Sequence, residues 1–407
     1  MMRILRNNKK EIERLFHRFT PQKKRVTEGV RNILEKVRVE GDKALVAFTK
    51  KFDKVCITPP QLKITEREIL DAYHAIRPDF VKNLKAILEN VTAYYVRQKR
   101  KSWKFKTKDG VLLGEKIEPL ESVGVYIPAG SAPLISTVYM TVLPAQIAGV
   151  KRIALVSPPQ KDGNIDPHIL VVANLLKIKE MYKIGGAQAI AALAYGTKTI
   201  PKVDKIVGPG NEYVSEAKRQ VFGNVDIDMI AGPSEVVVIA NRYSNPQFVI
   251  KELQAQAEHR KGLAILITTS KMLAKTVKNK VGTGYIILAK NTEEAIYLSN
   301  KIAPEHLHIM INKPERFISS VRHAGAIFVG QYTPVALGDY VAGPSHVLPT
   351  SGTARFFSGL GINDFVKSSH IISYSKKALE KVAPIVENIA KLEGLVGHWE
   401  SVETRLH

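Results

Sequence analysis

Short runs rich in β-branched residues alternate with longer helical stretches from Val123 to Gly330, and this alternation limits the possible fold more than any other feature. Strands separated by helices in this way build βαβ units, whose strands lie parallel in one sheet. We predict strands at residues 152–157, 180–184, 205–207, 235–240, 263–268, 285–289, 307–311 and 326–329. So many strands favour two doubly wound halves over a single sheet, which places the chain in the α/β class.

The segments on either side of this region follow other patterns. Residues 1–100 are predicted to be mostly helical, and from Lys101 the aromatic residues Trp103 and Phe105 alternate with lysines, as in a half-buried strand. After His370, apolar residues recur at helical spacing, at Val382, Ile385, Val386, Ile389 and Leu392. Such an amphipathic helix either docks on a partner subunit or folds back on its own chain, and the sequence leaves both open.

The composition indicates a multidomain globular protein of the cytoplasm. With 407 residues and 45% hydrophobic content, the chain is long enough to bury two or more cores. Its one cysteine, Cys56, cannot form an intrachain disulfide, and the sequence has no apolar run of signal-peptide or membrane-spanning length. We therefore expect a reducing compartment and no membrane partner.

The net charge of +22 raises the question of a nucleic-acid partner. Residues 97–108 mix lysine and arginine with aromatic residues, as nucleic-acid surfaces can. From Lys101, however, the lysines and the aromatic residues fall on opposite sides of the predicted strand. This alternation favours a strand with a solvated face, so we expect no nucleic-acid partner.

Three glycine-containing turns suggest a nucleotide site, although the Gly-x-Gly-x-x-Gly pattern of the usual dinucleotide site is absent after the predicted strands. Residues 185–188 and 208–211 stand at the carboxyl ends of predicted strands, and residues 126–130 make a third turn. Each turn alone is more typical of a tight connection than of a phosphate site. Three of them in one half of the protein favour nucleotide binding.

Gln256 and His259 stand at positions i and i+3 of a predicted helix, from which both can reach one ion. Alone, such a pair is more typical of a structural contact, because glutamine is an uncommon zinc ligand. Asp339 and His346 lie in a loop rich in glycine, and His398 lies in the C-terminal tail. Each can be an ordinary turn or structural residue, or a nitrogen or oxygen donor to a metal.

Glu305 and His306 follow Pro304 just past a predicted helix. An imidazole next to a carboxylate suits abstraction of an alcohol proton and activation of water at mild pH. The alternative is a solvated glutamate beside a histidine that caps a strand. His308 would face the same side of a strand as His306 and competes for its role, but the preceding Pro304–Glu305 restricts the approach of His306, so we favour His306 as the base.

Taken together, these segments resemble the histidinol dehydrogenase family over nearly the whole chain. The resemblance is carried by residues 123–128, 185–190, 207–211, 231–235, 256–259, 303–307 and 346–350, and by the tail that ends at His398. It implies a zinc enzyme that oxidises L-histidinol to L-histidinal and then to L-histidine. Two NAD would be reduced in succession, in the last stage of histidine synthesis.

The resemblance also implies a role for each candidate residue. One zinc ion per subunit would be bound by Gln256, His259, Asp339 and His398. NAD would contact Tyr126, Gln188 and Asn211. The substrate would contact Ser234, Gln256, His259, His306, Asp339, Glu393 and His398, with His346 at or beside such a position. His306 would be the general base, and Glu305 would activate water.

A homodimer follows from the same resemblance, because Glu393 and His398 would come from the second subunit. The implied architecture has two Rossmann-like parallel-sheet domains, one inserted in the other. A helical arm would span residues 1–20, and a discontinuous domain with the metal and catalytic residues would span 21–122 and 235–365. The inserted NAD-binding domain would span 123–234, and a helical dimerisation segment 366–407.

Two other functions stay open. A related zinc and NAD enzyme could oxidise another primary alcohol, although Glu393 argues against it. A basic RNA-binding or scaffold protein could retain the fold without catalysis, although the complete set of proposed ligands disfavours it. An aldehyde dehydrogenase that forms a thiohemiacetal needs a nucleophilic cysteine, and Cys56 lies outside every motif above.

Overall fold

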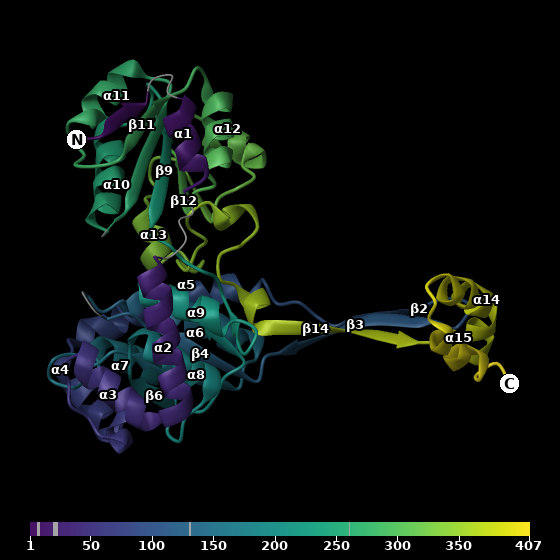
Figure 1. Ribbon diagram of the computed structural model, residues 1–407. Helices are drawn as coiled ribbons and strands as arrows, with labels where there is room; N and C mark the ends of the chain where they lie inside the picture. Colours follow the sequence, from purple (N-terminus) through teal and green to yellow (C-terminus); the bar gives the residue numbers. More distant parts are fainter. Residues whose placement is uncertain (6–8, 19–22, 130–131, 260) are drawn as a thin grey trace. The chain divides into compact units, whose positions relative to one another are not determined.

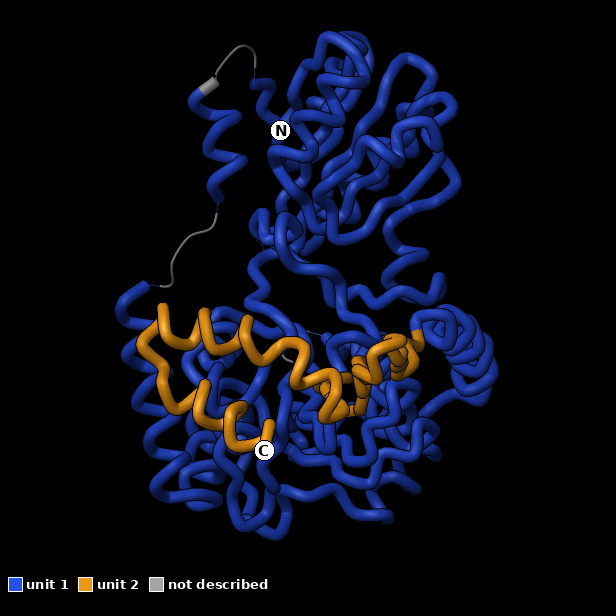
Figure 2. Tube along the Cα trace, turned by 90° about the vertical axis from the view of Figure 1, so that its right-hand side faces the viewer, with its two compact units in different colours: residues 1–98, 120–365 blue, residues 99–119, 366–407 orange. Residues whose placement is uncertain are grey.

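The computed structural model describes residues 1–5, 9–18, 23–129, 132–259 and 261–407. The chain divides into two compact units, one of residues 1–98 and 120–365 and the other of residues 99–119 and 366–407 (Figure 2). Across these described ranges, no helix combines the length and the apolar composition that a membrane span requires. The first unit contains parallel sheets, and the second contains an antiparallel sheet.

Six described strands of the first unit form a parallel sheet in the order β1-β11-β10-β9-β12-β13. In that order they span Arg3–Leu5, Tyr285–Leu288, Leu263–Thr268, Glu235–Ala240, His306–Ile309 and Ala326–Val329. Side chains of β9 alternate between two apolar clusters, Val236 and Val238 in one and Val237 and Ile239 in the other. Figure 1 shows the helices that cover the two faces, α10 (Pro246–Glu258) with α11 (Lys271–Lys278) and α1 (Lys9–Phe16) with α12 (Thr292–Ile302).

Five further strands form a second parallel sheet in the order β6-β5-β4-β7-β8, counted over the described residues. They span Glu180–Lys183, Arg152–Ser157, Ser122–Tyr126, Lys205–Val207 and Asp226–Ile227. The helices between them are α6 (Ile135–Ala148), α7 (Pro167–Leu175), α8 (Gly186–Tyr195) and α9 (Glu212–Val221). Each of the four connections between these five strands contains one helix, as the alternating pattern predicts.

Both parallel sheets are doubly wound. From β4 the chain adds β5 and β6 on one side and then returns to place β7 on the other side, and β9 is flanked in the same way by β10 and β12. The whole five-stranded sheet falls in sequence between β1 and β9, so one parallel-sheet domain is inserted in the other. The predicted α/β class with two parallel-sheet domains is confirmed.

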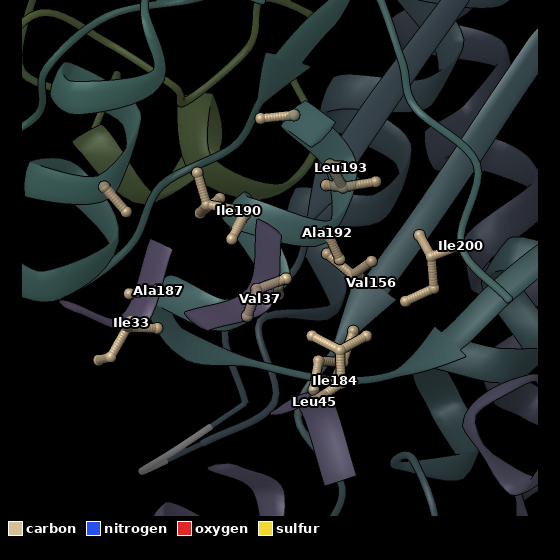
Figure 3. Packing of buried hydrophobic residues seen from close by; sticks show 14 of the residues in the cluster. Ile33, Val37, Leu45, Val156, Ile184, Ala187, Ile190, Ala192, Leu193 and Ile200 are labelled. Carbon is tan, nitrogen blue, oxygen red and sulfur yellow. The ribbon is translucent and has the colours of Figure 1, made fainter. Parts of the chain in front are cut away.

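Two N-terminal helices, α2 (Lys24–Glu40) and α3 (Asp42–Phe52), pack with the five-stranded sheet. Val37 and Leu45 are fully buried in one apolar cluster with Ile184 and Ile190, which Figure 3 shows. Burial of such side chains contributes about 1.5–3 kcal/mol each, which holds these helices in place. The helices η1 (Pro59–Leu62), α4 (Glu66–Ala75) and α5 (Pro78–Val96) follow.

The expected domain boundaries stay predictions. In the packing just described, α2 and α3 share a core with the five-stranded sheet, although both lie in the segment 21–122 that was assigned to the other domain. The expected arm at residues 1–20 contains β1 as well as α1. Residues 6–8, 19 and 20 of that arm, and Gly130 of the third glycine turn, lie outside the described residues.

The second unit contains an antiparallel sheet in the order β14-β3-β2, followed by two helices. These elements are β2 (Trp103–Lys106), β3 (Leu112–Pro119), β14 (Val366–Ser373), α14 (Lys376–Leu392) and α15 (Val396–Glu403). The predicted strand at Trp103 and the predicted helix after His370 are confirmed. The side chains of Trp103 and Phe105 stack on each other but stay 52% and 51% exposed, so the apolar side of β2 is uncovered in the single chain.

Candidate active site

A cavity of about 1220 Å³ reaches the amino ends of β9 and β12. Parallel strands begin at the same edge of a sheet, and α10 runs back from the carboxyl end of β9, so α10 ends at this edge too. Residues far apart in sequence therefore meet there. The candidate residues that line the cavity are Ser234, Gln256, His259, Glu305, His306, Asp339 and His346.

The end of α10 supplies Gln256 and His259. His259 follows the last helical residue, and its backbone N–H donates to the carbonyl of Gln256 at 3.3 Å. Gln256 is buried, and its Nε2 has no hydrogen-bond partner among the described residues. A Cβ at Gly262 would overlap the Gln256 carbonyl oxygen, so glycine allows the chain to enter β10 this close to the end of α10.

The short helix α13 (Val335–Tyr340) brings Asp339 to the same place. Its Oδ1 lies 3.8 Å from Nε2 of His306. Burial raises the pKa of Asp339, the charges of Glu305 and Glu252 raise it further, and His306 and His259 oppose this shift. Asp339 and His306 therefore lie next to each other at the wall of the cavity.

The pair Glu305–His306 is oriented by the peptide group of Glu235 at the start of β9. Oε2 of Glu305 accepts a hydrogen bond from the backbone N–H of Glu235 at 2.8 Å. Nδ1 of His306 lies 3.0 Å from the carbonyl oxygen of the same residue and 3.4 Å from Oε2 of Glu305. Because a carbonyl only accepts, Nδ1 carries a proton. Nε2 of His306 has no hydrogen-bond partner among the described residues.

The electrostatic surroundings of His306 favour its charged form. Burial alone would lower the pKa of this imidazole, but the Glu305 carboxylate, Asp339 and the Glu235 carbonyl outweigh burial and raise its pKa to about 9. In the metal-free protein the imidazole therefore holds a proton at neutral pH. It becomes a base as the pH approaches 9.

Two other histidines take different positions. His308, the alternative base, is fully buried, with Nε2 2.9 Å from the Gly330 carbonyl oxygen and Nδ1 3.3 Å from Oε1 of Glu252. His306 lines the cavity and His308 does not. Nε2 of His346 lies 2.9 Å from Oγ of Ser136, and burial lowers the pKa of His346 to about 4.

The glycine turns bring Tyr126 and Gln188 together at the carboxyl edge of the five-stranded sheet. The hydroxyl of Tyr126 accepts a hydrogen bond from the backbone N–H of Gly186 at 3.1 Å. A Cβ at Gly186 would stand 2.7 Å from Oε1 of Gln188, so both side chains converge on this turn. Asn211 is the N-cap of α9, and its Oδ1 accepts from the backbone N–H groups of Tyr213 and Val214 at 3.0 and 3.1 Å.

Two candidate residues belong to the second unit. Glu393 is the C-cap of α14, His398 lies on α15, and both side chains are exposed. Within the described part of the chain, no three His, Cys, Asp or Glu side chains gather closely enough to hold a metal ion. The residues that this structure assembles in one unit are therefore Gln256, His259 and Asp339, together with the Glu305–His306 pair.

Sequence reasoning missed the backbone of Glu235 and the side chains of Ser136 and Glu252. Backbone contacts carry no side-chain signature, so the peptide that orients Glu305 and His306 was not detectable as a motif. Glu252 lies one helical turn before Gln256 on α10, and this i, i+4 spacing was the available signal for it.

The fold and the cavity are those of an α/β enzyme, with a carboxylate and an imidazole side by side at the cavity wall. The chain matches the family model described as histidinol dehydrogenase over residues 17–406. A histidinol dehydrogenase of Halalkalibacterium halodurans is 48% identical over 397 residues, which covers 93% of both chains. One of Bacillus subtilis is 48% identical over 395 residues, which covers 92% of both. A crystal structure of the histidinol dehydrogenase from Elizabethkingia anophelis has 37% identity and a TM-score of 0.94, covering 100% of this chain and 98% of that chain.

The chain therefore belongs to the histidinol dehydrogenase family, and it is an oxidoreductase. The resemblance seen in the sequence is confirmed.

We expect the His306 imidazole of the chelator-treated protein to titrate near pH 9 and that of His346 near pH 4. Replacement Glu305→Gln should lower the pKa of His306, because it removes the negative charge 3.4 Å from Nδ1. NMR titration of the imidazole nitrogens measures the pKa values of His306 and His346 and the effect of Glu305→Gln.

The raised pKa of His306 also affects the stability of the fold. Since folding raises this pKa above 6.5, the stabilising contribution of His306 is complete below pH 6.5 and is lost as the pH passes about 9. A His306 that titrates at 6.5 contradicts the described surroundings.

Proposed function

We propose that this protein oxidises L-histidinol to L-histidine through L-histidinal, with reduction of two NAD, as the last stage of histidine biosynthesis. The observation that carries the proposal is the Glu305–His306 pair, held on the Glu235 peptide at the wall of the cavity. The names of the relatives support the choice of substrate. Both oxidation steps require a base that takes a proton from a hydroxyl group while the carbon that bears it loses a hydride, and such a pair can supply that base.

Zinc is the metal that the donor set fits. Gln256, His259 and Asp339 line one cavity, and we propose that His398 of the partner subunit completes the set. Gln256 is buried at the cavity, and Oε1 is the atom of its amide that could bind an ion, because Nε2 only donates hydrogen bonds. Nitrogen and oxygen donors are accepted by zinc. When bound, zinc would hold the imidazole and amine of the substrate and so place the reacting carbon near His306.

The carboxyl edge of β4 and β7 fits NAD. The order of strands reverses between β4 and β7, and ligands of open α/β sheets bind at such a switch point. A Cβ at Gly208 would overlap the carbonyl oxygen of Tyr126, and φ of Gly208 is +116°, so glycine is required at this turn. We propose that Tyr126, Gln188 and Asn211 contact NAD, which would accept a hydride in each oxidation.

His306 would act as the base in both oxidations. Its Nε2 would take the hydroxyl proton of the alcohol first and a hydroxyl proton of the hydrated aldehyde later. The contact of Nδ1 with the Glu235 carbonyl fixes the ring and leaves Nε2 on the side of Asp339, which lines the cavity. The neutral form of His306, which can accept the proton, becomes more abundant as the pH rises toward about 9.

Glu305 would act between the two oxidations. Its carboxylate would take a proton from water as the water oxygen bonds to the aldehyde carbon, and His306 would return the proton it took from the alcohol to the aldehyde oxygen. This gives the gem-diol that is oxidised next and leaves His306 neutral for the second oxidation. The N–H of Glu235 holds one carboxylate oxygen at 2.8 Å, so the group is positioned before the aldehyde forms. Ser234 lines the same cavity and is a proposed substrate contact, with His346 beside it in this role.

A homodimer would complete each site. Helix α14 carries Ile385, Ile389 and Leu392 on one side, and these side chains are 64%, 49% and 78% exposed. Apolar residues at this spacing form a stripe that a second protein surface can cover. Glu393 and His398 follow this stripe directly in the chain. A partner subunit that covers the stripe would therefore lie close to both side chains.

His306→Asn should lower the rate of histidinol oxidation by about 10²–10⁴-fold, because the base is lost. Glu305→Gln should spare the first oxidation and slow the second, which lowers NADH formed per histidinol from two toward one. The measurement is NADH formation with L-histidinol and with L-histidinal as separate substrates. Glu315→Gln, an exposed carboxylate on η2 (Pro314–Ser320), is the matched control. Equal loss of both steps in Glu305→Gln contradicts the separate roles.

Mixed dimers should recover activity that two inactive variants lack. A dimer of one His306→Asn chain and one His398→Ala chain has one site with both defects and one intact site. Random pairing of equal amounts should therefore restore about a quarter of wild-type activity, since half of the dimers are mixed. Each variant alone at the same concentration is the control. An inactive mixture that does contain mixed dimers would exclude a site shared between subunits.

A further inference from the structure

Arg18, just after α1, binds the side chain of Glu235. Nε of Arg18 donates to Oε1 of Glu235 at 2.6 Å, and Nη2 donates to Oε2 of the same carboxylate. The backbone N–H of Ser351 also donates to Oε1 at 3.1 Å. Both side chains are nearly buried, so this bidentate pair is shielded from solvent. Neither side chain has a part in the proton transfers described above.

The same guanidinium group binds the backbone just before the catalytic pair. Nη1 of Arg18 donates to the carbonyl oxygen of Ile302 at 2.5 Å, and Nη2 donates to that of Ala303 at 3.4 Å. Ala303 ends α12 with φ of +49°, a left-handed conformation that is strained for a residue with a side chain. Glu305 stands two residues further on. Arg18 therefore holds the turn from which the catalytic pair extends.

Arg18 thus contacts both chain segments that orient Glu305 and His306. One is the turn that precedes them, and the other is Glu235, whose N–H binds Glu305 at 2.8 Å and whose carbonyl oxygen lies 3.0 Å from Nδ1 of His306. Movement of either segment would change the position of both groups.

The positive charge of Arg18 also stabilises the ionised form of the buried Glu235 carboxylate. Burial raises the pKa of Glu235 and the nearby Glu305 carboxylate raises it further, whereas the hydrogen bonds and charge of Arg18 oppose both. Without Arg18, a buried carboxylate would remain beside Glu305, and no other cation among the described residues binds it. Such a group moves toward solvent or takes up a proton, and either change would disturb the peptide that holds the pair.

We propose that Arg18 is a positioning residue, which sets the placement of Glu305 and His306 through the Glu235 carboxylate and the carbonyls of Ile302 and Ala303. This inference rests on the proposed function only for the roles of Glu305 and His306. The contacts themselves do not depend on the substrate.

The test compares Arg18→Met and Arg18→Lys with the control Arg3→Met, which removes an exposed ion pair to Glu11 at the same end of the chain. We expect Arg18→Met to lower kcat on the order of 100-fold for both L-histidinol and L-histidinal. A small displacement of catalytic groups from their reactive positions lowers the rate by about this factor. KM should change by less than about threefold, since the proposed zinc ligands and substrate contacts are untouched. The kcat of Arg18→Lys should lie between those of the wild type and Arg18→Met, because lysine keeps the charge but not the bidentate geometry.

A second readout separates this inference from the proposed function. The Nδ1–H signal of His306 in NMR spectra of the folded protein reports its bond to Glu235 without any turnover, and Arg18→Met should shift it while Arg3→Met should not. Unchanged kcat and an unchanged signal in both Arg18 variants would overturn the inference and leave the proposed function intact. If the wild-type protein turns over no histidinol but the Nδ1–H signal of His306 is shifted in Arg18→Met, the proposed function would be overturned and the positioning role would stand.

Discussion

The peptide group of Glu235 is the contact on which the rest of the site depends. Its N–H binds the carboxylate of Glu305, and its carbonyl oxygen binds the imidazole of His306. One rigid planar group therefore sets the distance between Glu305 and His306. It also determines that Nε2 is the ring nitrogen of His306 on the side of Asp339. Backbone groups cannot be protonated or rotated away as side chains can, so this arrangement keeps its geometry while His306 changes charge.

The two doubly wound sheets make that contact possible. Because β9 and β12 are parallel neighbours, Glu235 and His306 start side by side, and the return of α10 brings Gln256 and His259 to the same edge. The five-stranded sheet contributes its carboxyl edge, since Pro209 and Gly210 after β7 also line the cavity. The cavity thus has one sheet that offers glycine turns and one that offers the side chains to which we assign proton transfer and metal binding.

Much of this was predictable from residues, and the exceptions have physical reasons. The eight predicted strands overlap β5, β6, β7 and β9 to β13, because buried parallel strands are continuous apolar runs. The prediction omitted β1 and β8, which are three and two residues long, and β4, in which Gly124 interrupts the apolar pattern. It also omitted β3 and β14, which mix polar with apolar residues. The likeness to a known family led to the cavity residues, since Gln256 and Asp339 carry weak signals alone. The contacts of Arg18 and Ser136 depend on tertiary structure and left no pattern in the sequence, whereas Glu252 was marked only by its spacing from Gln256 on α10.

The most direct test of the account is the amount of NADH formed per L-histidinol consumed by the purified protein, before and after treatment with a chelator and then with zinc. The account predicts two NADH per substrate, loss of turnover with the chelator and recovery with zinc, because a four-electron oxidation needs two hydride transfers at a metal-held substrate. One NADH per substrate, or full turnover without metal, would contradict the proposed mechanism. No turnover of L-histidinol in the presence of zinc would contradict the proposed substrate.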